Sequence, residues 1–200
     1  MAGIVIATSN AHKVQEYKAL INDDRVELES LLDYPGFPGV EENGKTFEEN
    51  ASIKAVAASK YCGVPAFADD SGLEVAALNN EPGIYSSRYA PTDPERIAKL
   101  LKNLEGVTDR RARFVCVIAI AFNGEVIATF EGEIRGTIGF EPKGENGFGY
   151  DPVFIPEGET RTFAELSSEE KNRISHRANA FRKASEFVEE QLAGMIESFQ

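Results

Sequence analysis

The sequence has 200 residues, enough for one compact domain or for two small lobes that share a core. Its 33 acidic residues against 21 lysines and arginines give a formal net charge of −12. This charge excludes sequence-independent nucleic-acid binding through a broad basic face, so we expect no nucleic-acid partner. It leaves room for one small anionic ligand in a local basic pocket.

The first third of the chain predicts strands that alternate with a helix. A buried strand is expected over 3–7, and a polar turn follows it. Asn10 is a good N-cap for a helix over 11–21. A second strand is expected over 26–32, and the breakers in 33–45 predict a loop.

A well-marked helix and a short strand come next. Thr46 and Glu49 have the spacing of a capping box, so a helix should begin there. This alanine-rich helix should end at about Cys62, because Gly63 is a typical C-terminal stop. A short buried strand is expected over 65–68, directly before a pair of aspartates.

The middle of the chain predicts a helix and a long hairpin. The pair Asp93-Pro94 begins a helix that should reach about Leu104. Strands are expected over 113–122 and 126–134. Asn123-Gly124 lies between them, and this dipeptide is the strongest short signal for a hairpin turn.

The last third predicts one more strand and a helical end. A strand is expected over 153–155, and Ser167 with Glu170 forms a second capping box. The helical stretch should continue to about Ile196, with a break near Ser175. Strands that alternate with helices, plus one hairpin, predict an α/β fold with a mixed sheet. We find no linker and expect a single domain over 1–200.

Location is predicted from what the sequence lacks. Cys62 and Cys116 form neither a disulfide framework nor a zinc motif, and we expect buried thiols in a reducing compartment. The apolar run 4–7 is too short for a signal-peptide core. The longest apolar run, 114–122, is far shorter than the roughly 20 residues of a membrane-spanning helix. We therefore expect a cytoplasmic protein without membrane contact.

Residues 39–46 match the phosphate-binding pattern G-x-x-x-x-G-K-[ST]. That pattern works where a strand leads into a helix and backbone N–H groups surround phosphates. Here a Pro/Gly loop precedes it, and Glu41 and Glu42 fill the turn with negative charge. The segment is better interpreted as a surface loop before a capped helix, or as a loop whose glutamates hold a cation.

The acidic run Asp69-Asp70-Ser71-Gly72 follows the expected strand 65–68. Ligands of α/β sheets gather at carboxyl ends of strands, and carboxylates suit Mg²⁺. Neighbours on an extended chain point to opposite sides, so one aspartate should face the site and the other support it. An aspartate-rich turn without function is an equally good interpretation from the sequence alone.

Three further segments suit a phosphorylated ligand. Residues 8–13 place Lys13 in the first turn of a helix, where anions bind, although plain helix capping explains them too. The glycine-rich loop 144–151 offers two aromatic rings to a base, or packs them on the core. Basic residues are concentrated in 171–183 of an otherwise acidic chain. Such a cluster is typical of a phosphate-binding site, and a solvent-exposed basic face is the alternative interpretation.

Two other features have no predicted catalytic role. The basic cluster 110–113 is interpreted as a surface or subunit contact. His12 has no partner at the spacing of a metal ligand or a nucleophile. Taken together, acids, cations and an aromatic loop predict a site for a nucleotide polyphosphate and a divalent cation.

The sequence resembles the inosine triphosphate pyrophosphatases, also known as Ham1-like proteins. The resemblance covers nearly the whole chain and lies in ordered motifs, which are Thr8-Ser9-Asn10 to Lys13 with Glu16, Ala68 to Leu73, Gly147 to Pro152, and Lys171 with Ser175-His176-Arg177. It implies an α/β fold of two lobes, with a long mixed sheet flanked by helices and an active-site cleft. It also implies a homodimer that hydrolyses dITP, ITP and XTP to the monophosphate and pyrophosphate with Mg²⁺, which cleanses the nucleotide pool.

The resemblance also implies roles for individual residues. Asp70 would be the general base and, with Glu42, a metal ligand. The substrate-binding residues would be Thr8, Ser9, Asn10, Lys13, Ser71, Phe148, Gly149, Tyr150, Asp151, Lys171, His176 and Arg177. A donor such as Lys171 or His176 would favour the 6-oxo group of inosine and xanthosine over the 6-amino group of adenine.

Two rival functions remain open at this point. Septum-inhibitor-type (Maf) proteins have similar chemistry but favour pyrimidine or modified nucleotides, which a substrate panel would separate. A regulator that senses nucleotides would bind without releasing pyrophosphate, and the acids Glu42, Asp69 and Asp70 argue against it.

Overall fold

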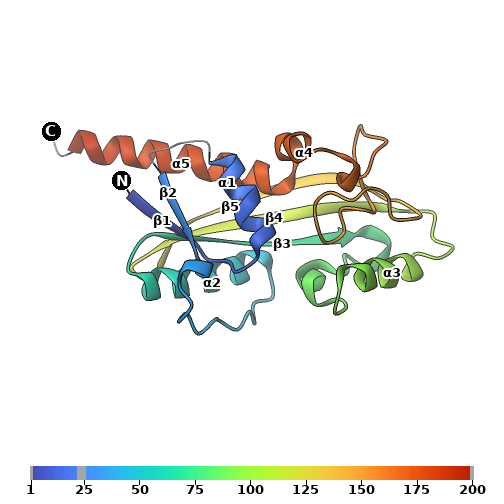
Figure 1. Ribbon diagram of the computed structural model, residues 1–200, viewed down its shortest axis with the longest axis horizontal. Helices are drawn as coiled ribbons and strands as arrows, with labels where there is room; N and C mark the ends of the chain where they lie inside the picture. The colour runs from blue at the N-terminus through green and yellow to red at the C-terminus, as the bar shows by residue number, and fades with distance from the viewer. Residues whose placement is uncertain (1, 22–25, 199–200) are drawn as a thin grey trace.

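The structure is a computed structural model that describes residues 2–21 and 26–198. Six strands form one mixed sheet in the order β2-β1-β3-β4-β5-β6. The first three strands are parallel and the others antiparallel, so the predicted α/β fold with a long mixed sheet is confirmed. Figure 1 shows helices on both sides of this long, twisted sheet. Among the helices of the described residues, none has the length and apolar character needed to cross a lipid bilayer.

The N-terminal elements agree closely with the local sequence signals. The strands are β1 (Ala2–Ile6) and β2 (Val26–Ser30), with the helix α1 (Ala11–Leu20) between them. A single 3₁₀ turn, η1 (Leu31–Asp33), replaces the expected end of the second strand. The side chain of Asn10 accepts hydrogen bonds from the first turn of α1, as predicted.

Helix α2 (Phe47–Cys62) also begins and ends where its capping residues predict. Thr46 Oγ1 accepts from the Glu49 N–H at 3.1 Å, and Gly63 ends the helix with φ +71°. The capping box is only half formed, because the Glu49 carboxylate accepts from the Lys45 N–H instead of from Thr46.

The strand β3 (Ala66–Val75) is much longer than the predicted 65–68. It continues through the aspartate pair and pairs antiparallel with β4 (Arg111–Phe122) along its whole length. The prediction stopped at Ala68 because polar residues usually end a buried strand. Here the buried charges of this strand are paired with cations, so the strand continues.

The hairpin of β4 and β5 (Glu125–Ile138) is the longest pairing in the sheet. Its turn residues Asn123 and Gly124 have φ of +51° and +80°, as the dipeptide predicts. Only the end of β5 pairs with β6 (Phe154–Pro156).

Three helices complete the fold after β3. Helix α3 (Asp93–Asn103) lies beyond the two 3₁₀ segments η2 (Ala76–Leu78) and η3 (Gly83–Arg88). A last 3₁₀ turn, η4 (Phe163–Glu165), precedes α4 (Ser168–Ile174) and α5 (His176–Ser198). Ser175 separates α4 from α5 in extended conformation, so the predicted break is confirmed.

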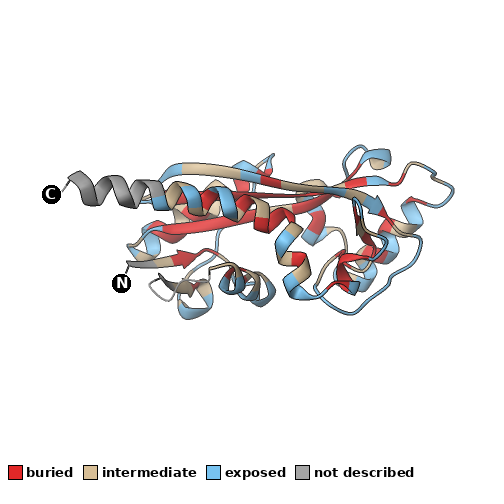
Figure 2. Cartoon of the chain, turned by 90° about the horizontal axis from the view of Figure 1, so that it is seen from above, coloured by how far each residue is buried: buried red, intermediate tan, exposed pale blue. Residues whose placement is uncertain are grey.

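Alternate residues of the central strands face different helices. Ala66 and Ala68 belong to the apolar cluster under α2, whereas Phe67 belongs to the cluster under α1 and α5. A third cluster lies toward α3 and includes Leu73 and Phe154. Figure 2 shows long buried runs along the central strands, and β3 and β4 are buried over most of their length, whereas β5 is mostly intermediate or exposed.

Two expectations about single residues need correction. Arg110 is buried and donates to the carbonyls of Leu104, Ile138 and Gly139, so it is a structural residue and not part of a surface contact. Its basic neighbours are satisfied by acids instead. Of the two free thiols, Cys116 is buried as expected, but Cys62 is half-exposed.

Candidate functional site

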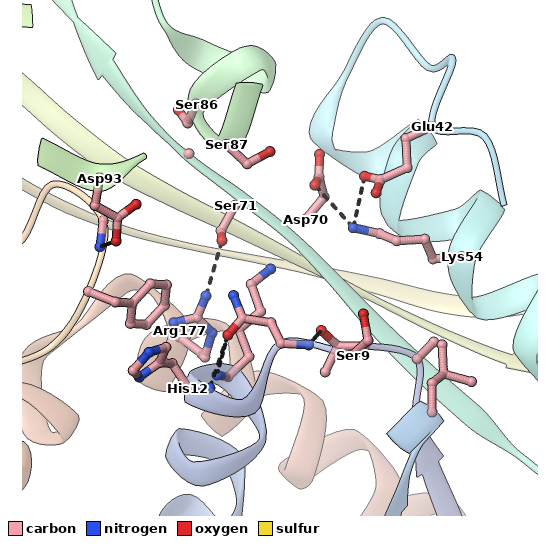
Figure 3. A pocket seen from close by; sticks show the side chains of 18 of the residues that line it. Ser9, His12, Glu42, Lys54, Asp70, Ser71, Ser86, Ser87, Asp93 and Arg177 are labelled. Carbon is pink, nitrogen blue, oxygen red and sulfur yellow. Dashed lines mark hydrogen bonds and ion pairs between the residues drawn. The ribbon is translucent and has the colours of Figure 1, made fainter. Parts of the chain in front are cut away.

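A cleft of about 740 Å³ lies where the strand β3 passes between α1, α2 and the segments near α3. Its walls come from parts of the chain that are far apart in sequence. All the predicted site residues line it, namely Thr8, Ser9, Asn10, Lys13, Glu42, Asp70, Ser71, Phe148, Gly149, Tyr150, Asp151, Lys171, His176 and Arg177. Figure 3 shows several of them converging on one space.

Asp69 and Asp70 point to opposite sides of β3, as expected for neighbours on a strand. The Asp69 side chain is fully buried, and its carboxylate is 2.9 Å from Lys13 Nζ and 3.0 Å from Arg177. Burial alone would raise the pKa of Asp69, but Lys13 and Arg177 outweigh it and hold the pKa well below its ordinary value. Asp69 is therefore a charged anchor for two cations.

Asp70 has a different environment on the α2 side of the strand. Its Oδ1 is 3.1 Å from Lys54 Nζ, whereas its buried Oδ2 has no hydrogen-bond partner within the described residues. Burial raises the pKa of Asp70, and the opposing charges of Lys54 and Lys13 do not cancel this effect. A carboxylate with a free oxygen and a raised pKa is suited to accept a proton.

Glu42 reaches the same place from the loop before α2. Lys54 Nζ lies 3.1 Å from Glu42 Oε2 and also 3.1 Å from Asp70 Oδ1, so the two acids share one cation (Figure 3). Burial lowers the pKa of Lys54, but the surrounding carboxylates more than compensate and raise it above its ordinary value. Glu42, whose negative charge argues against a phosphate-binding loop over 39–46, therefore lines the cleft.

A buried ionic cluster forms the other end of the cleft. Lys171 Nζ lies 2.8 Å from Glu16 Oε1 and 2.7 Å from Asp151 Oδ2, and Arg177 also pairs with Glu16. The Phe148 N–H donates to Asp151 Oδ2 at 3.0 Å, which fixes the loop to this cluster. Burial would raise the pKa of Glu16, but its two cations lower it, so the glutamate stays charged.

His176 and Arg177 are the first residues of α5 and differ in character. Arg177 is almost completely buried and donates from Nη2 to Ser71 Oγ at 3.0 Å. His176 stacks on Phe114 with ring centroids 4.7 Å apart, and its Nδ1 is buried without a described partner. Burial, together with the charges of Arg177 and Lys171, lowers the pKa of His176 well below 6.5, so its imidazole is neutral.

Some residues of the cleft were missed by sequence reasoning. No local pattern marks Lys54, because its partners Glu42 and Asp70 lie in other segments of the chain. The sequence predicts no partner for His12, yet its ring stacks on Phe148. Ser86 and Asp93 also line the cleft, and no local pattern marks them.

Comparison with known proteins identifies the family. The model of the Ham1 family matches residues 4–187. The chain belongs to the Ham1 family. It is similar to the "dITP/XTP pyrophosphatase" of Bacillus licheniformis, with 50% identity over 195 residues that cover 95% of this chain and 100% of the relative. The relative of the same name from Geobacillus kaustophilus is 51% identical over 199 residues, which cover 97% and 98%.

Solved structures of the Ham1 family have the same architecture. The Ham1 protein of Staphylococcus aureus is 45% identical, with a TM-score of 0.84 over 94% of this chain and 99% of that one. A HAM1 protein from Coxiella burnetii is 46% identical, with a TM-score of 0.85 over 95% and 100%. The curled mixed sheet and its flanking helices are thus the fold of the Ham1 family.

Proposed function

We propose that this chain is a nucleoside triphosphate pyrophosphohydrolase that acts on dITP, ITP and XTP. The bond that breaks is the phosphoanhydride between the α- and β-phosphates, and the products are the monophosphate and pyrophosphate. The observation that carries the proposal is that the two ends of the cleft differ in chemistry. At one end Asp70 has a carboxylate with a free oxygen. At the other end the aromatic ring of Phe148 lies beside buried charged groups. The names of the relatives that share half of its sequence support the same activity.

Asp70 is the proposed general base. Its Oδ2 accepts a proton from the attacking water, whose oxygen forms the new bond to phosphorus while pyrophosphate or the monophosphate leaves. Lys54 holds the other oxygen of this carboxylate at 3.1 Å and so fixes its orientation. Asp69 has no such role, because both of its oxygens are occupied by cations.

Glu42 and Asp70 are the proposed ligands of Mg²⁺. The fit rests on their oxygen donors and on the cation that the two acids already share, since Lys54 Nζ lies 3.1 Å from both Glu42 Oε2 and Asp70 Oδ1. The described residues hold no group of three or more metal-ligating side chains. Two carboxylates completed by substrate phosphates and water suit Mg²⁺, which rarely has an all-protein cage. When bound, the ion would neutralise phosphate charge and polarise the reacting phosphorus.

The phosphate-binding role is assigned to the start of α1. Thr8, Ser9, Asn10 and Lys13 line the cleft beside β3. Helix N-termini and ammonium groups are favourable for phosphates, and phosphoryl transfer depends mainly on positioning and charge neutralisation.

Base recognition is assigned to the loop 148–151 and the ionic cluster. An ammonium group has three donors, and Lys171 uses two of them on Glu16 and Asp151. The third can donate to a 6-oxo oxygen. A 6-amino group is itself a hydrogen-bond donor, so it would place two donors opposite each other and leave both without an acceptor. This geometry supports selection of hypoxanthine and xanthine over adenine.

The homodimer implied by the resemblance and the cytoplasmic location expected from the sequence belong to the same proposal. The sensor alternative gives no reason for a carboxylate with a free oxygen in the cleft, and a substrate panel separates the Maf-type alternative from the proposed function. The described structure offers no separate observation in favour of either.

Product analysis tests the proposed function. The protein and Mg²⁺ are incubated separately with dITP, XTP, dGTP, dATP and dTTP, and the products are separated by anion exchange. Monophosphate and pyrophosphate from dITP and XTP, with little from the rest, are expected. A diphosphate product, a preference for dTTP, or binding without turnover would each contradict the proposal.

A further inference from the structure

The rings of His12 and Phe148 are stacked across the cleft. Their centroids are 5.2 Å apart and their planes differ by 15°. His12 lies in the first turn of α1, and the loop of Phe148 is far away in sequence. The side chain of His12 is exposed and makes no hydrogen bond within the described residues. Its position therefore depends on stacking alone.

The same face of α1 carries both His12 and Glu16. These residues are four apart and so lie one above the other on the helix. Glu16 holds Lys171 and Arg177, and those cations lie 5.1 and 5.8 Å from the centroid of the Phe148 ring. Helix α1 thus presents to Phe148 both an aromatic ring and the cluster assigned to the purine edge.

A purine that stacks on the face of Phe148 that His12 covers lies between Phe148 and α1. His12 is the ring that it meets there. We propose that His12 is a second stacking partner of the base, so that the purine binds between the rings of His12 and Phe148. This assignment rests on the proposed function, since it takes a purine nucleotide as the ligand.

The required movement is small. A base between two rings needs about 7 Å between the ring planes, which is twice the stacking interval of about 3.4 Å. The stacked rings therefore part by about one interval, roughly 3.4 Å along their normal, and keep their nearly parallel orientation. The imidazole of His12 has no hydrogen bond to break, so rotation of its exposed side chain provides this space.

Stacking is tolerant of base identity, because every base has a π-face. His12 should therefore add affinity for any purine and leave the preference between 6-oxo and 6-amino groups to Lys171. It should add nothing to the binding of phosphate groups alone. These two expectations separate stacking from a role of His12 as a cation beside the phosphates.

The test is direct binding by calorimetry with dIMP and with tripolyphosphate, which has no base. The variants are His12→Ala, His12→Phe and His12→Leu, and Lys18→Ala is the control on an exposed part of the same helix. His12→Ala and His12→Leu should weaken dIMP binding about tenfold. His12→Phe should stay within threefold of wild type, and tripolyphosphate should bind all variants equally.

Several results would overturn the stacking role. Unchanged or tighter dIMP binding by His12→Ala would mean that His12 does not hold the base. A parallel loss of tripolyphosphate binding would assign His12 to the phosphates. If His12→Phe weakened dIMP binding as much as His12→Ala does, an aromatic ring at this position would not be what holds the base. Hydrolysis of dITP by the wild-type protein tests the proposed function separately, because the binding measurements need no turnover.

Discussion

Asp69 and Asp70 are adjacent on β3, yet their surroundings shift the pKa values of the two carboxyl groups in opposite directions. Asp69 has two cationic partners and a lowered pKa, whereas Asp70 has a free oxygen and a raised pKa. The difference follows from the alternation of the strand, which turns Asp69 to α1 and α5 and Asp70 to α2. Stability and catalysis are therefore expected to separate between two neighbouring carboxylates.

Asn substitutions at the two positions test this separation. Asp70→Asn should lower kcat for dITP by two to four orders of magnitude, because the general base is lost, while nucleotide binding and the free energy of unfolding remain. Asp69→Asn should cost about 3–5 kcal/mol of folding free energy, because it leaves buried Arg177 short of its partner. Urea unfolding and steady-state kinetics on both variants measure the effects. Retained turnover in Asp70→Asn would remove the base assignment.

Lys13 is expected to act on the substrate more than on the chemical step. Its ammonium group lies beside Asp69 at the start of α1, and its side chain is only 14% exposed. Lys13→Ala should raise KM for dITP about tenfold and change kcat little, since a phosphate contact worth about 1.4 kcal/mol is lost. Lys18→Ala, an exposed site on the same helix, should change neither constant. An unchanged KM in Lys13→Ala would exclude Lys13 from phosphate binding.

The residues that sequence reasoning found and missed differ in the kind of signal they leave. Phe148 and Lys171 lie in motifs with unusual local composition, so they stand out without a structure. Lys54 and His12 acquire their significance only from partners that are distant in the chain. A residue whose role depends on long-range pairing has no local pattern by which to recognise it.

At the scale of elements, predictions succeeded where one or two residues decide a boundary. Asn10 and Gly63 set helix ends, and Asn123-Gly124 sets the hairpin, because each satisfies a backbone requirement locally. The length of β3 was underestimated, because its continuation past Ala68 depends on charges supplied by α1, α2 and α5. Local propensity cannot include such tertiary compensation.

The contact between β5 and α5 depends on Gly132. An added Cβ there would lie 2.2 Å from Ala180 N and 2.3 Å from His176 O, which is too close for any side chain. Gly132→Ala should therefore cost about 1–3 kcal/mol of stability. It should also weaken dITP hydrolysis, because α5 carries Arg177 at the end that would be displaced.

Gly139→Ala is the matched control for this prediction. Its added Cβ would have ordinary contacts, the nearest at 3.6 Å from Ile155 Cδ1. Thermal unfolding and activity of both variants are compared with wild type. Equal stability of the two variants would show that α5 does not need the close approach at Gly132.

At the scale of the whole molecule, the cleft joins three apolar clusters through buried charges. Glu16, Asp69 and Asp151 are matched by Lys13, Lys171 and Arg177, so the ionic groups of the centre are paired. His176 lies within this centre, and protonation would add a positive charge that burial and its cationic neighbours oppose. Folding therefore keeps His176 neutral.

This neutral histidine makes the folded protein sensitive to acid. In the unfolded chain His176 takes up a proton near pH 6.5, whereas in the folded chain its lowered pKa prevents this. Below about pH 6.5 the unfolded state binds the additional proton, so the free energy of unfolding falls by up to about 1.4 kcal/mol per pH unit. Above that pH the residue contributes no pH dependence.

His176→Phe isolates this contribution, because the ring can still stack on Phe114 while the titratable group is lost. Urea unfolding of the variant and wild type is measured from pH 5 to pH 8. The variant should gain stability relative to wild type as the pH falls below about 6.5, whatever its offset at pH 8, because all other titrating groups are common to both proteins. Parallel stability curves would mean that His176 is protonated in the folded protein. The buried centre would then contain an additional positive charge, and a compensating anion would have to be sought there.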